Sequence, residues 1–125
     1  MEPAVYTHLV ELARRLASAT LADTAKWSAE PDDTFRYAGK RGVVSVRSRD
    51  KDGEQPYELL VYNEAGERVE HLASQWDDGD RPAEWNEALA DLYYVARRQA
   101  LGAEKVVDAL LSELKPSAEE RAAGA

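Results

Sequence analysis

The spacing of apolar residues changes twice along the chain, and this change constrains the fold more than any other feature of the sequence. Apolar residues between positions 3 and 26 recur at the three- and four-residue spacing of one helix face. Between 34 and 72 they alternate with polar residues, and after about position 80 the helical spacing returns. The gaps between the alternating segments are shorter than the crossovers that parallel strands need. The sequence therefore predicts an α+β fold with an antiparallel sheet.

The predicted sheet is a four-stranded meander. Its strands are expected at about 34–38, 43–49, 57–62 and 68–72. Turns that contain glycine, at 39–42 and 63–66, join neighbouring strands. The segment 27–33 holds Pro31 and two aspartates, and we interpret it as a break after the first helix.

The helices are expected to pack together on one face of this sheet, which is a stable two-layer arrangement. A second helix should begin near Asp80, and Gly102 either bends it or separates it from a third helix. Pro116 ends the pattern. We expect a single domain over 1–115, followed by a flexible tail over 116–125.

Alternation assigns the strand residues to the two sheet faces. The expected register places Tyr37 opposite Val44, Val46 opposite Leu59, and Val61 opposite Val69. On this register His71 points toward the core and Leu72 away from it. The expected core anchors are Leu9, Leu12, Leu16, Phe35, Val44, Val46, Leu59, Val61, Leu89 and Leu92.

The face turned away from the helices is the predicted partner-binding surface. Its candidate residues are Arg36, Val43, Arg47, Glu58, Leu60, Tyr62 and Glu70. One interpretation is a docking face, with an apolar centre around Leu60 and a polar rim. The other is a solvated face on which Arg47 and Glu58 form a cross-strand pair.

Composition excludes several classes of function. The net charge of -8 makes direct nucleic-acid binding unfavourable, although residues 34–49 hold five basic residues and no acid. No cysteine is present, so disulfides, thiolate catalysis and cysteine-based zinc sites are excluded. No apolar run reaches the ~20 residues of a membrane span, and no signal peptide is recognised. A cytoplasmic location is expected.

Chemical motifs are missing as well. His8 and His71 are the only histidines, and no spacing of His with Glu fits a metal site. There is no phosphate-binding glycine loop and no nucleophile motif. We therefore expect no cofactor, no metal and no catalytic residues, and we favour a protein that is not an enzyme.

In size, acidity and helix–sheet–helix layout, the chain is similar to small bacterial partner-binding proteins such as immunity proteins and secretion chaperones. The excess of arginine over lysine, eleven to five, is compatible with a bacterial genome of high GC content. No shared motif carries this similarity, so it assigns no residue a role.

The leading hypothesis is a small acidic interaction module that binds a protein partner through the sheet face, or pairs with a second copy as a homodimer. One alternative is an acidic decoy that mimics nucleic acid. The other is a metabolite-binding domain or small enzyme, with a pocket near His71, Trp76 and Tyr93.

Overall fold

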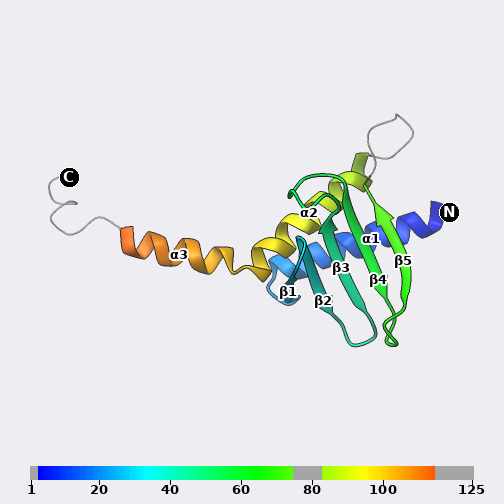
Figure 1. Ribbon diagram of the computed structural model, residues 1–125, viewed down its shortest axis with the longest axis horizontal. Helices are drawn as coiled ribbons and strands as arrows, with labels where there is room; N and C mark the ends of the chain where they lie inside the picture. The colour runs from blue at the N-terminus through cyan, green and yellow to red at the C-terminus, as the bar shows by residue number, and fades with distance from the viewer. Residues whose placement is uncertain (1–2, 75–82, 115–125) are drawn as a thin grey trace, which may run out of the picture.

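The computed structural model describes residues 3–74 and 83–114, and it is α+β (Figure 1). The elements, in chain order, are α1 (Pro3–Leu21), β1 (Trp27–Glu30), β2 (Thr34–Ala38), β3 (Val43–Ser48), β4 (Tyr57–Tyr62), β5 (Arg68–Ala73), α2 (Ala83–Ala100) and α3 (Ala103–Leu114). Helices α1 and α2 lie behind the sheet in Figure 1, and α3 extends away from both. The predicted Asp80 cap, Trp76 and the tail over 116–125 lie outside the described residues.

The sheet is antiparallel with the order β1-β2-β3-β4-β5, so the meander has five strands and the prediction of four is wrong. The missed strand is β1, in which only Trp27 is buried. Three exposed residues leave no alternation for sequence reasoning to detect. The turn from β1 into β2 contains Asp32 and Asp33 at φ values of 66° and 57°, a left-handed backbone that aspartate tolerates better than most residues.

Helix α1 ends at Leu21 rather than at the predicted residue 26, because Asp23 has a left-handed φ of 63°. The first residue of β1, Trp27, anchors the chain beyond this point. Its indole N–H donates to the Thr20 hydroxyl at 2.8 Å, and that hydroxyl donates to the Leu16 carbonyl. The Trp27 backbone N–H donates to the Gln99 side chain on α2 at 2.6 Å. Trp27 therefore ties the edge strand to both helices, and the chain must leave the helix before reaching it.

The core lies between the sheet and the two long helices. Helix α2 crosses strands β1 to β4, whereas α1 packs mainly against α2. Eight of the ten predicted core anchors are buried, while Leu12 and Val61 are partly buried and pack against them. The side chains of Val46, Leu59, Leu89 and Leu92 are fully buried. Each such side chain stabilises the fold by about 1.5–3 kcal/mol relative to an exposed one.

Strand β5 departs from the predicted register. The pairs Tyr37–Val44 and Val46–Leu59 are confirmed. Val61, however, faces Glu70 rather than Val69, because a β-bulge inserts an extra residue into β5. The insertion reverses the alternation beyond it, so Leu72 enters the core and His71 faces outward, the opposite of the prediction.

Gly102 separates α2 from α3. Its φ of 67° lies in the left-handed region that ends helices, which answers the question that the sequence left open. The expectation that the C-terminal helices pack on the sheet is confirmed for α2 and wrong for α3, which has no buried residue.

Candidate functional site

The predicted partner-binding face is formed largely as expected. Six of its seven residues, all except Glu70, lie on the sheet face away from the helices: Arg36, Val43, Arg47, Glu58, Leu60 and Tyr62. The bulge in β5 moves Glu70 to a position opposite Val61, on the helix side.

The centre of this face is not exposed. Leu60 retains only 3% of its accessible surface, and Ser45 and Glu58 are also buried. Leu60 lies on a central strand between Ser45 on β3 and His71 on β5. Its expected exposure is therefore wrong, although Leu60 lies on the predicted face of the sheet.

Glu58 is the hub of the polar residues on this face. Its carboxylate accepts a hydrogen bond from Arg47 Nε at 2.9 Å, and its other oxygen lies 2.8 Å from His71 Nε2 and 3.7 Å from Arg49 Nε. Burial alone would raise the pKa of Glu58, but the contacts with His71 and Arg47 outweigh it and hold the pKa below its usual value.

These contacts confirm the expected cross-strand pair of Arg47 and Glu58. They also give the buried carboxylate the partners that it needs. The charges on this face therefore pair with one another and stabilise the sheet. The buried Leu60 offers little apolar area to a partner.

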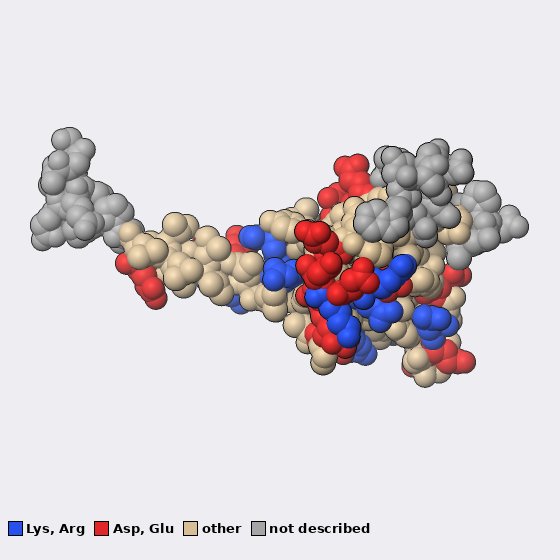
Figure 2. Space-filling view, turned by 45° about the horizontal axis from the view of Figure 1, so that its top comes forward, with Lys and Arg blue, Asp and Glu red and all other residues tan. Residues whose placement is uncertain are grey.

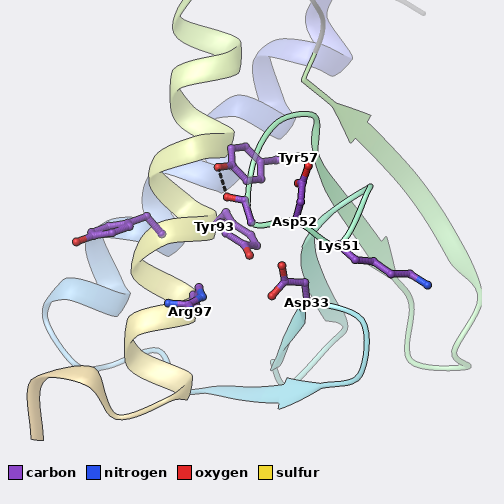
Figure 3. A pocket seen from close by; sticks show the side chains of 8 residues that line it. Asp33, Lys51, Asp52, Tyr57, Tyr93 and Arg97 are labelled. Atoms are coloured by element: carbon purple, nitrogen blue, oxygen red, sulfur yellow. Dashed lines mark hydrogen bonds between the residues drawn. The ribbon is translucent and has the colours of Figure 1, made fainter. Parts of the chain in front are cut away.

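A hollow of about 400 Å³ lies on the opposite face of the sheet, at the end where the loop joins β3 to β4, against α2 (Figure 3). Four parts of the chain contribute to it: the turn between β1 and β2, the loop between β3 and β4, the first residue of β4, and α2. Its lining residues are Asp33, Lys51, Asp52, Gly53, Tyr57, Tyr93, Tyr94 and Arg97.

The loop that forms one wall of the hollow is held by its own hydrogen bonds. Asp52 Oδ1 accepts from the Ser48 hydroxyl and from the Glu54 backbone N–H. The Tyr57 hydroxyl donates to the Gly53 carbonyl at 2.9 Å. Lys51 has a φ of 61°, which is uncommon for a residue other than glycine, whereas Gly53 adopts its φ of 79° without strain.

Tyr93 forms the floor of the hollow. Its ring stacks on Tyr57 with centroids 4.6 Å apart and meets Phe35 edge-on. Only 3% of Tyr93 is exposed, and its hydroxyl has no hydrogen-bond partner in the described part of the chain. Burial raises the pKa of Tyr93 to about 12, and the Asp33 carboxylate, a hydrogen-bonding neighbour of the hydroxyl at longer distance, adds to the rise, so the hydroxyl is neutral at physiological pH.

The hydroxyl and Asp33 face the same space, and Figure 3 shows Tyr93 reaching from α2 toward Asp33. A Cβ atom built on Gly53 would lie 4.0 Å from both Tyr93 Oη and Asp33 Oδ2. Of the three pocket residues expected from the sequence, Tyr93 lines this hollow. His71 lies on the opposite sheet face, and Trp76 falls outside the described residues.

Sequence reasoning missed Asp33, Tyr57 and Arg97 as members of one site. They come from three separate segments with no motif spacing, so only the fold brings them together. Among the described residues, no group of three or more His, Asp or Glu side chains is arranged to hold a metal ion.

Helix α3 presents the largest run of exposed apolar residues in the described chain. Five side chains form what we call the α3 stripe, and each is 47–77% exposed: Val106, Val107, Leu110, Leu111 and Leu114. Their spacing places them on one side of the helix. Most of the α3 surface visible in Figure 2 is uncharged.

No protein-family model, curated protein or solved structure matches this chain. Within residues 3–74 and 83–114, no helix combines the length and the apolar character needed to cross a lipid bilayer.

Proposed function

We propose that this protein is a non-enzymatic interaction module that docks on a partner protein through the α3 stripe. The observation that carries the proposal is the exposure of all five stripe residues. Apolar side chains grouped on one helix face normally pack against another element, and contiguous exposed patches mark interaction sites. The partner-binding role inferred from the sequence is kept, but its surface moves from the sheet to α3.

An apolar groove suits this helix better than a flat surface. The 12 residues of α3 span only about 18 Å. Stable interfaces bury about 1,200–2,000 Å² in total, which a single contact line along so short a helix does not provide. A groove encloses the stripe on several sides, as in other helix-in-groove complexes.

Charge favours a different protein over a second copy as the occupant. The charged residues of α3 are Glu104, Lys105, Asp108 and Glu113, so acids outnumber bases three to one. The whole chain carries a net charge of -8, and two copies would bring like charges together. The proposed partner therefore presents an apolar groove with a basic rim.

Two matched variants test the stripe. Leu110→Glu places a charge on the stripe, whereas Ser112→Glu places the same charge on the opposite side of α3. Both residues are exposed, so both variants should unfold at the temperature of the wild type. Partner binding should fall at least tenfold in Leu110→Glu only and should weaken as salt rises.

Cross-linking in the host lysate identifies the occupant. A photo-reactive residue at position 111 of the full chain should give one adduct with another protein, and the same group at position 105 should give none. Equal adducts from both positions would contradict docking through the stripe. An adduct with a second copy, supported by a dimer in light scattering, would overturn the proposed partner.

A further inference from the structure

The hollow above Tyr93 is lined by two charged groups that have no ion-pair partner among the described residues. Asp52 is engaged by Ser48 and Glu54, and Lys51 pairs with Asp32 at 3.5 Å. Asp33 and Arg97, by contrast, form no ion pair with any residue that the structure describes. One negative and one positive group therefore line the same hollow without a charged partner.

The Tyr93 hydroxyl is the second, independent observation. A hydroxyl that is taken out of water without a hydrogen bond destabilises the fold, and native proteins rarely leave such a group unpaired. The electrostatic effects of both Asp33 and Arg97 reach this hydroxyl. It therefore lies within the influence of both charges, and a ligand carboxylate there would give it a partner at close hydrogen-bond distance.

We propose that this hollow binds a small zwitterion of the α-amino-acid class. Its ammonium group contacts the Asp33 carboxylate, its carboxylate contacts the Arg97 guanidinium, and the Tyr93 hydroxyl donates to that carboxylate. The site is separate from the α3 stripe, so it does not depend on the proposed partner.

The size and walls of the hollow fit this class. Its volume of about 400 Å³ lies within the range of small-molecule sites. Tyr57 and Tyr94 add aromatic surface for the side chain of the ligand, and an ammonium group gains from aromatic faces. A simple amine would leave Arg97 without a partner, and a simple acid would leave Asp33 without one.

The first experiment measures binding to the full chain. Thermal unfolding is followed with each of the common L-amino acids at about 10 mM, a concentration that stabilises the fold measurably if Kd is near 1 mM or below. At least one amino acid should raise Tm. If none does, the proposal is wrong.

Probes that keep the side chain of the ligand but lack one of its two charges then test whether both charges are needed. If L-phenylalanine binds, phenethylamine and 3-phenylpropionate carry the same ring with only one of its two charges. Another amino acid is compared with its own amine and acid in the same way. Each single-charge probe should bind at least tenfold more weakly by calorimetry. If the amine binds as tightly as the amino acid, the role assigned to Arg97 is wrong. If the acid binds as tightly as the amino acid, the role assigned to Asp33 is wrong.

Three variants and one control place the ligand. Tyr93→Phe, Asp33→Asn and Arg97→Gln should each weaken binding at least tenfold, and asparagine tolerates the left-handed backbone of Asp33. Asp23→Asn makes the same change at an exposed aspartate with a φ of 63° that does not line the hollow, and this variant should bind normally.

Binding that all three variants retain would exclude this hollow. Leu110→Glu should keep full amino-acid affinity, so failure of the ligand site and failure of the α3 proposal give different results.

Discussion

Replacing Tyr93 by phenylalanine removes one oxygen atom and tests the central observation about the hollow. The ring contacts with Tyr57 and Phe35 do not involve that oxygen, so the packing should stay unchanged. An unpaired buried hydroxyl costs about 1–3 kcal/mol of desolvation, and phenylalanine avoids this cost. In the free protein, we therefore expect the free energy of unfolding to stay constant or rise by roughly 1–2 kcal/mol.

Urea unfolding of the ligand-free protein measures this change. The urea concentration at the midpoint should stay the same or rise. The slope of the free energy of unfolding against urea should not change, because unfolding exposes the same surface in both proteins. Tyr94→Phe is the matched control on the next residue. Tyr94 is 59% exposed, so this variant should change the free energy of unfolding by less than about 0.5 kcal/mol.

The opposite result would refute the reasoning. If Tyr93→Phe lowers stability by about 1 kcal/mol, the hydroxyl forms a hydrogen bond in the free protein. Asp33 is the nearest candidate, and Asp33→Asn would then change the effect of removing the hydroxyl in a double-mutant cycle. Such coupling would make the pair a structural contact and would remove the argument for a ligand.

Further predictions concern the outer sheet face and α3. The pKa of Glu58 is lower in the folded state than in the unfolded state. The ionised Glu58 carboxylate therefore stabilises the fold fully above the ordinary glutamate pKa. This stabilisation is lost as pH falls through the lowered pKa. Glu58→Gln should therefore cost roughly 2 kcal/mol at neutral pH and flatten the loss of stability in an acid titration followed by circular dichroism. A steeper acid loss in that variant would contradict the assignment. Leu60→Asp should lower the free energy of unfolding by more than about 3 kcal/mol, because it buries an unpaired charge; a stable variant would mean that the outer face is open. Leu110→Glu should reduce fluorescence of a dye that binds apolar surface, whereas Ser112→Glu should not, and equal fluorescence would argue against the stripe as the exposed patch.

The periodicity of the sequence determined a large part of the fold. It predicted the α+β class, the order of the helices and the antiparallel meander, and it paired β2, β3 and β4 in the observed register. These features follow from local rules, because side chains two apart on a strand, or three to four apart on a helix, share a face whatever surrounds them. Tyr93 is buried and its neighbour Tyr94 is exposed, because successive residues of a helix point in different directions.

Only the tertiary structure decided which faces are covered. Leu60 occupies the sheet face that alternation assigned to it, yet it is buried there. The α3 stripe has the pattern of a packed helix, yet the fold leaves it exposed beyond Gly102. A pattern reports which residues share a face. Burial depends on what other parts of the chain bring to that face, and so does the meeting of Asp33, Tyr93 and Arg97 in one hollow.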